Sequence, residues 1–200
     1  MPVPAATVDD VALLRRTASG DTTAFDAIVE AHQSAVGRFL TSLGVADLDD
    51  ALQETFIAAW RSAGTYQGTG SVRSWLLSIA RNVHRHGARR RVNEPATFVS
   101  LDVLAERAGW GCDPAESRRV DLSMARDVLE HALAILPDEE REILVLRELE
   151  ELSGEETAQL LQISLAAMKS RLHRARLHLA AVVRRLDQPH SVTGGADVSH

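Results

Sequence analysis

The sequence predicts an all-α protein of two small helical domains joined by a flexible linker. Alternating β-branched residues, the usual sign of a strand, are nearly absent, and only 4% of the residues are aromatic. Apolar residues instead recur at helical spacing in two blocks, residues 9–91 and 122–186. Residues 92–121 between them hold two prolines and two glycines and show no lasting period, which indicates a flexible linker.

The first domain is expected to hold four helices whose ends are marked by capping residues and glycines. Gly20 ends the first helix, and Asp21, a residue type that often caps helix N-termini, is expected to cap the second. Gly44 ends the second helix, and a glycine-rich loop precedes the fourth. The expected spans are 9–19, 21–44, 47–61 and 71–91.

The second domain is expected to contain four further helices, of which the last two form a helix-turn-helix. Pro137 separates the first pair, and Ser153 with Glu156 matches a capping box at the start of the third. Residues 187–200 hold a proline and two glycines and are expected to form a disordered tail. The expected helices span 122–136, 138–151, 153–161 and 164–186.

The net charge of −6 argues against a nucleic-acid partner, but the charges are segregated along the chain. Residues 81–91 hold five arginines and no acid, and residues 164–186 hold six lysines and arginines and no acid. Acidic residues gather between these segments, over residues 138–156. This segregation predicts two anion-binding surfaces and other partners for the acidic segment. Charge alone would fit solvated helix faces equally well.

The helix expected over 164–186 has the two faces of a DNA-reading helix, and Ser164 can cap its start. The predicted inward face consists of Leu165, Met168, Leu172, Leu179 and Val183. The predicted outward face consists of Ala167, Ser170, Arg171 and Arg174, with Lys169 and Arg176 at its margin. Small residues permit a close approach, and arginines contact guanine edges or phosphates. The caps and the small Ala158 favour a helix-turn-helix over an ordinary amphipathic hairpin.

The helix expected over 47–61 also has two different faces. Leu48, Leu52 and Phe56 lie on the side that is expected to be buried. The opposite side carries Asp50, Gln53, Glu54 and Ile57. An exposed isoleucine within an acidic stripe suggests a protein partner with a basic surface. A solvated face would fit the same pattern.

An aromatic side chain in the glycine-rich loop lies next to an arginine-lined helix. We expect Tyr66 to contact a ligand, since a tight glycine loop offers little core to bury it, whereas Trp60 and Trp75 are expected in the core. The polar side of the helix expected after the loop carries Arg73, Ser74, Ser78, Arg81 and Arg85. Aromatic rings and arginines of this kind hold unstacked bases of single-stranded DNA.

Several other classes of protein fit the sequence poorly. No apolar run is long enough to cross a bilayer, and the first ten residues lack the features of an export signal, which favours the cytoplasm. Cys112 is the single cysteine, so a disulfide framework is excluded. The histidine pairs 84/86 and 173/178 lie among arginines and lack nearby carboxylates, so neither a metal, another cofactor nor an enzymatic activity is expected.

Three stretches in this order resemble the extracytoplasmic-function group of bacterial RNA polymerase sigma factors. They are Asp47-Leu-Asp-Asp-Ala-Leu-Gln-Glu-Thr-Phe, Ser74-Trp-Leu-Leu-Ser-Ile-Ala-Arg-Asn82, and residues 152–176, which end in Lys-Ser-Arg-Leu-His-Arg-Ala-Arg. The resemblance covers roughly residues 9–186. The short linker favours this group, because larger sigma factors carry an extra domain there. In place of the usual turn glycine this chain has Gln162, and Thr157 stands where Ile or Val is usual.

The resemblance implies a role for each surface. Residues 50, 53, 54 and 57 would dock on the β′ clamp helices of core RNA polymerase, and the second domain would meet the β flap. The −10 promoter element would be engaged and melted by the loop with Tyr66, Arg73, Arg81, Asn82 and Arg85. The −35 element would be read as duplex by Ala167, Lys169, Ser170, Arg171, Arg174 and Arg176. A dedicated anti-sigma factor is expected to clamp the domains together and hide both DNA surfaces.

The alternative is a stand-alone helix-turn-helix regulator that does not join polymerase. Such a regulator usually needs a dimer interface to match a palindromic site, and no heptad or dedicated apolar surface is visible. Tight binding of promoter DNA without polymerase would favour the regulator.

Overall fold

The computed structural model describes residues 8–90, 128–129 and 131–187, and these residues form helices and connecting turns without a strand. The first domain contains α1 (Val8–Ala18), α2 (Thr22–Ser42), α3 (Leu48–Ser62), the short 3₁₀ turn η1 (Ala63–Thr65) and α4 (Val72–Arg90). The second contains α7 (Asp138–Leu144), the π-helical turn η2 (Val145–Leu149), α8 (Gly154–Leu161) and α9 (Leu165–Asp187). The all-α prediction is therefore confirmed.

The ends of the helices in the first domain follow from local hydrogen bonds. The Asp21 side chain accepts from the Ala24 N–H at 3.1 Å, and the Asp47 side chain accepts from the Asp50 N–H at 3.0 Å. Gly20 adopts a positive φ of 94°, a conformation in which a side chain would be strained. These caps set the starts of α2 and α3 where the sequence predicts them.

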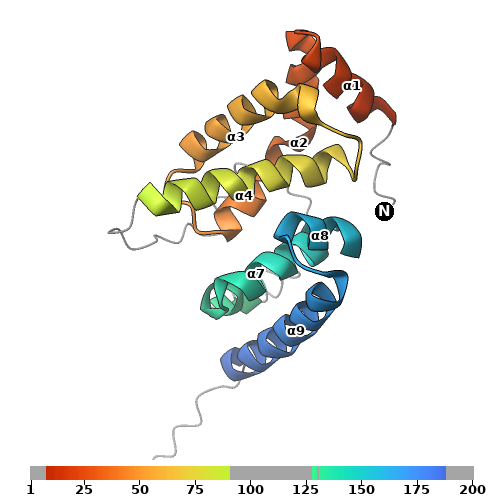
Figure 1. Cartoon of the computed structure of the whole chain (residues 1–200). Helices are drawn as coiled ribbons and strands as arrows, with labels where there is room; N and C mark the ends of the chain where they lie inside the picture. The colour runs from red at the N-terminus through yellow and green to blue at the C-terminus, as the bar shows by residue number, and fades with distance from the viewer. Residues whose placement is uncertain (1–7, 91–127, 130, 188–200) are drawn as a thin grey trace, which may run out of the picture.

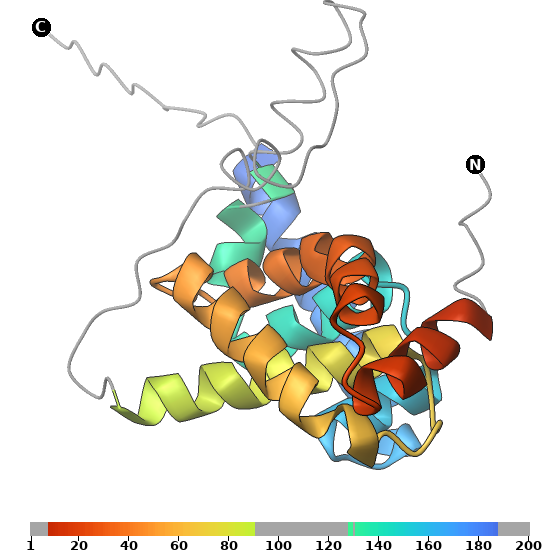
Figure 2. The same cartoon turned by 90° about the horizontal axis from the view of Figure 1, so that it is seen from above.

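Helix α2 packs against α1, α3 and α4 of the first domain, which Figure 2 shows from above. Ile28, Val36, Phe39 and Leu40 of α2 are completely or almost completely buried. Phe25 packs edge-on against Trp60, with ring centroids 5.2 Å apart, so the half-buried Trp60 lies at the edge of the core.

The second domain departs from the expected single helix over 138–151. The α-helix ends at Leu144, and residues 145–149 continue as a π-helical turn. The backbone N–H of Glu150 then bonds to the carbonyl of Val145 at 2.9 Å, and Glu151 takes a positive φ of 53°. This wider turn directs the side chain of Glu150 into the protein, where it is buried.

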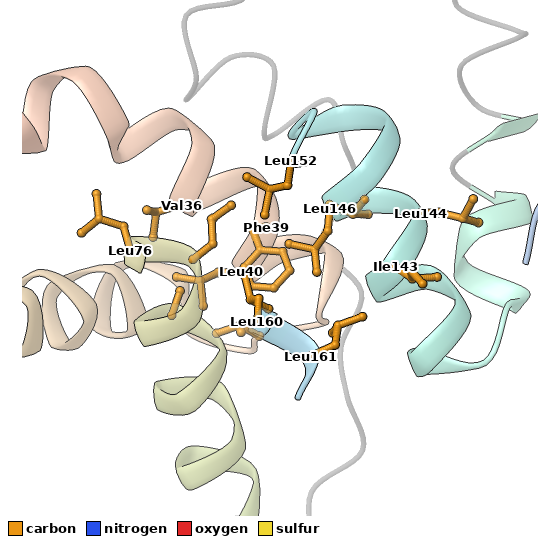
Figure 3. Packing of buried hydrophobic residues seen from close by; sticks show 14 of the residues in the cluster. Val36, Phe39, Leu40, Leu76, Ile143, Leu144, Leu146, Leu152, Leu160 and Leu161 are labelled. Atoms are coloured by element: carbon orange, nitrogen blue, oxygen red, sulfur yellow. The ribbon is translucent and has the colours of Figure 1, made fainter. Parts of the chain in front are cut away.

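The two domains pack directly against each other. Helix α8 lies beside α4 (Figure 1), and η2 contacts α2. Phe39 and Leu40 of the first domain share one buried apolar cluster with Leu146 and Leu160 of the second (Figure 3). The linker expected over 92–121, the start of the second domain at 122–127, Cys112 and the tail beyond Asp187 lie outside the described residues.

Candidate nucleic-acid and polymerase interfaces

Helices α8 and α9 form a helix-turn-helix whose termini are capped on both sides of the turn. Ser153 and Glu156 make the predicted capping box, with the Glu156 N–H donating to Ser153 Oγ at 3.1 Å and the Ser153 N–H to Glu156 Oε2 at 2.9 Å. Ser164 Oγ accepts from the Ala167 N–H at 3.1 Å and caps α9. Gln162 ends α8 with a φ of 59°, the left-handed conformation that glycine adopts without strain.

The two faces of α9 agree with the sequence pattern in part. Leu165, Leu179 and Val183, which were predicted to face inward, are half-buried, and Ala175 and Val182 are buried although the pattern did not include them. Met168 and Leu172 are buried, and the small Ala158 of α8 is buried where the two helices approach. The candidate −35 residues that lie exposed are Ala167, Lys169, Ser170, Arg174 and Arg176, whereas Arg171 is half-buried. A helix-turn-helix with this exposed surface has the shape and charge needed to enter a major groove.

Two of the predicted DNA contacts are paired with acids of their own domain. Arg171 Nη2 lies 3.1 Å from Glu139 Oε2, and Arg176 Nη2 lies 2.6 Å from Glu148 Oε1. Two glutamates of the acidic segment 138–156 therefore bind arginines of the same chain. From the sequence, other partners were expected for this segment, and partners within the chain were not considered. Because α9 itself contains no acid before Asp187, a reading of that helix alone does not reveal these pairs.

The predicted docking face of α3 is exposed as a whole. Asp50, Gln53 and Glu54 are exposed, and the exposed fraction of Ile57 is 41%. Thr55 and Ala59 on the opposite side are fully buried in the first domain. An exposed isoleucine among three polar acceptors therefore remains available to a partner.

The loop between α3 and α4 closes on itself. The Tyr66 hydroxyl donates to the carbonyl of Gly70 at 2.7 Å, and its ring packs edge-on against Trp75 with centroids 5.7 Å apart. Gly68 and Gly70 adopt φ values of 74° and 81°, which the turn requires. The expectation that this loop leaves Tyr66 without a core is wrong, because the ring is half-buried against Trp75.

A cavity of about 290 Å³ lies beside this loop. On one side it is lined by Tyr66, Trp75 and Asn82 of the first domain, and on the other by Gln159 and Leu160 of α8. The candidate −10 residues Tyr66, on the loop, and Asn82, on α4, therefore lie beside helix α8 of the second domain.

The arginines of α4 do not all face solvent. Arg73 donates to Glu150, and Arg81 Nε donates to Glu142 Oε1 at 2.6 Å, both across the interface between the domains. Arg85 and Asn82 are exposed. Ser74, which the pattern placed on the polar side, is buried, and its hydroxyl donates to the Ser71 carbonyl at 2.8 Å.

Sequence reasoning missed the acceptors that hold these arginines and the role of Arg38. Arg38 donates to Glu150 through Nε at 3.0 Å and Nη2 at 3.1 Å. One feature could have revealed the role of Arg38: it is the single charged residue in a run, Ala35 to Leu40 of α2, whose other members are buried. A charged side chain in such a position usually has a specific partner. That partner lies 112 residues away in the sequence.

The described part of the chain shows neither a membrane-spanning helix nor a cluster of metal-binding side chains. Among residues 8–90, 128–129 and 131–187, no helix combines the length and the hydropathy that crossing a membrane requires. Within the same residues, no three His, Cys, Asp or Glu side chains gather as a metal site would need.

Comparison with known proteins identifies both domains. Residues 28–94 match the family described as sigma-70 region 2, and residues 126–179 match sigma-70 region 4. The chain is 34% identical to the RNA polymerase sigma factor NccH of Alcaligenes xylosoxydans xylosoxydans over 178 residues, covering 88% of this chain and 95% of the relative. It is 31% identical to the ECF RNA polymerase sigma-E factor of Haemophilus influenzae, covering 84% of this chain and 91% of the relative.

A solved structure has a similar fold. CnrH in complex with the cytosolic domain of CnrY superposes with a TM-score of 0.62 at 26% identity, covering 90% of this chain and 99% of that chain. These findings confirm the resemblance drawn from the three sequence stretches. The chain belongs to the extracytoplasmic-function group of RNA polymerase sigma factors, the initiation factors that direct core polymerase to promoters.

Proposed function

We propose that this sigma factor reads the −35 element with α9, engages and melts the −10 element with the loop and helix α4, and docks on polymerase through α3. The observation that carries the proposal is the two-sided packing of α9, with Met168 and Leu172 buried while Ser170 and Arg174 point to solvent. The chain supplies promoter specificity, and the polymerase core supplies the chemistry of RNA synthesis.

The −35 contacts come from the exposed face of α9. Ser170 and Arg174 reach base edges or phosphates, Ala167 allows the helix to approach closely, and Lys169 contacts the backbone. Arg171 and Arg176 join them once phosphate competes with Glu139 and Glu148. Both acids are accessible to solvent, and ion pairs near the surface contribute little, so this exchange has a low free-energy cost.

The −10 contacts come from the cavity beside the loop and from the adjacent side of α4. The Tyr66 ring and the exposed amide of Asn82 line this cavity, and an aromatic ring beside an amide can stack on and hydrogen-bond a base displaced from the stack. Arg73, Arg81 and Arg85 hold the phosphates of the melted strand. Burial of Tyr66 against Trp75 supports this role, because a ring held in place stacks on a base without losing further freedom.

Docking on polymerase uses the acidic stripe of α3. Asp50, Gln53 and Glu54 accept hydrogen bonds from a basic surface on the β′ clamp helices, and Ile57 supplies an apolar anchor at its edge. The β flap receives the second domain. This arrangement explains why an apolar side chain stands exposed among acids.

An anti-sigma factor holds the chain inactive in the cytoplasm until a stimulus releases it. The solved complex of CnrH with the cytosolic domain of CnrY supports this part of the proposal, because the fold of CnrH matches that of this chain. In this chain the domains also lie close enough for one small protein to contact both.

Run-off transcription tests the proposal. Purified chain and core polymerase are given a library of genomic fragments, and the wild type is compared with an Asp50→Arg/Glu54→Arg variant. We expect the wild type to start transcripts at a small set of promoters and the variant to lose polymerase binding. The matched control is Asp26→Arg/Glu30→Arg, which makes the same charge change on exposed residues of α2. If core polymerase gains no specificity from the wild type, the stand-alone regulator becomes the better account.

A further inference from the structure

The loop between α3 and α4 borders a second cavity, on the side where the loop meets α1. This outer cavity has a volume of about 210 Å³, and we call the cavity of about 290 Å³ beside α8 the inner cavity. The walls of the outer cavity come from residues 11–18 of α1 and residues 63–68 of η1 and the loop. The outer cavity is therefore formed by the first domain alone.

The floor of the outer cavity is apolar. Leu14 and Ala63 belong to the buried core of the first domain, and Val11 packs against that core. A Cβ on Gly64 would lie 3.9 Å from the Cβ of Ala18, so only small residues stand where α1 and η1 meet. The flat face of an aromatic base would cover such a floor favourably, because apolar surface is then removed from water.

Polar side chains border the outer cavity where it meets solvent. Arg15 and Gln67 both line the cavity, and both are exposed. Among the described residues no carboxylate pairs with Arg15, whereas the neighbouring Arg16 binds Asp21 with 2.7 Å between Nη2 and Oδ2. A guanidinium donates to phosphate oxygens, and a glutamine amide can both donate to and accept from the edge of a base.

The outer and inner cavities share the side chains of Tyr66 and Gln67. The loop holds Tyr66 in place, since its hydroxyl donates to the carbonyl of Gly70 at 2.7 Å. A Cβ on Gly68 would meet no atom within 4 Å, so the loop is open to solvent at this position. Because single strands are bound by aromatic rings that contact successive bases, neighbouring nucleotides of one strand can occupy the two cavities.

We propose that the outer cavity is a second nucleotide site for the melted −10 strand, in which the base lies on the apolar floor and Arg15 binds the adjoining phosphate. An apolar floor beside an exposed arginine fits a nucleotide, whose base has apolar faces and whose phosphate is anionic. The inference rests on the proposed function of the loop. It extends the path of the strand from the inner cavity past Tyr66 to α1, a helix to which the proposed function gives no contact.

The test measures how the full-length chain binds a short, fluorescent, mixed-sequence single strand of DNA. Anisotropy titrations are run at a series of salt concentrations, starting at low ionic strength. A fully abasic strand of equal length is titrated in parallel, because it keeps the phosphates and lacks the bases.

Two variants probe the two halves of the site, each with a matched control. Arg15→Ala removes the cation, and Arg61→Ala removes an exposed arginine of the same domain that lines neither cavity. Ala18→Leu places a larger side chain in the outer cavity without a change of charge. Ala12→Leu makes the same substitution at an exposed position of α1 outside both cavities.

We expect Arg15→Ala to bind both strands about tenfold more weakly, the size expected for one charge-assisted contact. The slope of log affinity against log salt should also become shallower by about 0.7, the contribution of one phosphate contact to a single strand. Ala18→Leu should bind the intact strand about tenfold more weakly, as expected for the loss of one stacked base, with an unchanged salt slope. Its affinity for the abasic strand should equal that of the wild type.

The controls decide between the possible outcomes. Equal losses in Arg15→Ala and Arg61→Ala would indicate general charge attraction and would overturn the proposal. Equal affinity of Ala18→Leu and Ala12→Leu for the intact strand would overturn it too, since the cavity would then hold no base. All four variants change exposed residues, so their urea unfolding midpoints should match the wild type and exclude loss of folding as the cause.

Asn82→Ala separates this inference from the proposed function, because Asn82 lines the inner cavity but not the outer one. If Asn82→Ala weakens binding while Arg15→Ala and Ala18→Leu equal their controls, the inner site stands and the outer site is wrong. If Asn82→Ala binds like the wild type while the two outer variants bind weakly, the outer site stands and the role proposed for the inner cavity fails.

Discussion

The carboxylate of Glu156 binds Ser71 across 85 residues of sequence, through hydrogen bonds of 2.8 Å from the backbone N–H and 2.6 Å from the hydroxyl. The same carboxylate closes the capping box of its own helix by accepting from the Ser153 N–H at 2.9 Å. One side chain thus stabilises the start of α8 and joins that start to the beginning of α4. The integrity of the helix-turn-helix and the contact between domains are therefore coupled.

Stability should depend on the charge of Glu156 at low pH. Burial alone would raise its pKa, but hydrogen bonds from Ser71 and Ser153 lower the pKa from the ordinary 4.5 to about 2. A carboxylate whose pKa is lowered by folding stabilises the protein above the unfolded value and loses that contribution as pH falls towards the folded value. We expect the free energy of unfolding to decline between about pH 4.5 and pH 2, as measured by urea unfolding at a series of pH values.

The Glu156→Gln variant should lack this part of the decline, because glutamine does not titrate. The neighbouring Glu155→Gln variant, which alters an exposed side chain, should keep the wild-type pH profile. Identical profiles for the two variants would show that Glu156 does not carry the effect.

Releasing Arg171 should strengthen DNA binding with little effect on stability. Glu139, its partner at 3.1 Å, has a side chain that is 73% exposed, and such pairs contribute about 0–1 kcal/mol. We expect Glu139→Gln to change the free energy of unfolding by less than about 1 kcal/mol. The affinity of the polymerase holoenzyme for a duplex promoter should rise a few-fold in a gel-shift titration. A lower affinity would mean that Arg171 does not contact DNA.

Removing Arg174 should weaken recognition of the −35 element. A bidentate contact with a base is worth about 1–3 kcal/mol, so Arg174→Ala should lower holoenzyme affinity by that amount for promoters found in the run-off experiment. Arg185→Ala, which removes another exposed arginine near the end of the same helix, is the matched control. Equal losses in the two variants would point to general charge attraction and away from base recognition.

Gln162 should be a site where glycine stabilises the fold. Its φ of 59° places a side chain in the left-handed region, which costs roughly 1–2 kcal/mol for a residue with a Cβ. We expect Gln162→Gly to raise the free energy of unfolding by about 1 kcal/mol, measured by chemical denaturation. Gln159→Gly, on the exposed side of α8, should lower it by about 1 kcal/mol because glycine is a poor helix former. A loss of stability in Gln162→Gly would contradict the strain argument.

Much of the local structure could be read from the sequence because its causes are local. The caps at Asp21, Asp47 and Ser153 each bond to a backbone N–H three residues ahead, so residue type and spacing identify them. The inward face of α9 follows from helical periodicity in the same way. The exposure of the α3 stripe around Ile57 was predictable for that reason too.

The π-helical turn after Leu144 was not predictable, since residues 138–151 continue a helical pattern without a break. The half-burial of Tyr66 was missed because its partner, Trp75, belongs to the next helix and only the folded loop brings the rings together. Likewise, the buried position of Ser74 depends on how the loop turns into α4.

By itself the sequence determined the all-α class, the capped helices and the membership of a sigma factor group, because these depend on residues within a few positions of one another. Only the tertiary structure decided that Arg38, Arg73 and Arg81 face carboxylates of the second domain. Glu150 and Arg38 are 112 residues apart, and either could be a solvated surface charge when read locally. Their pairing follows from the packing of η2 on α2, where burying one charge is favourable only beside its opposite.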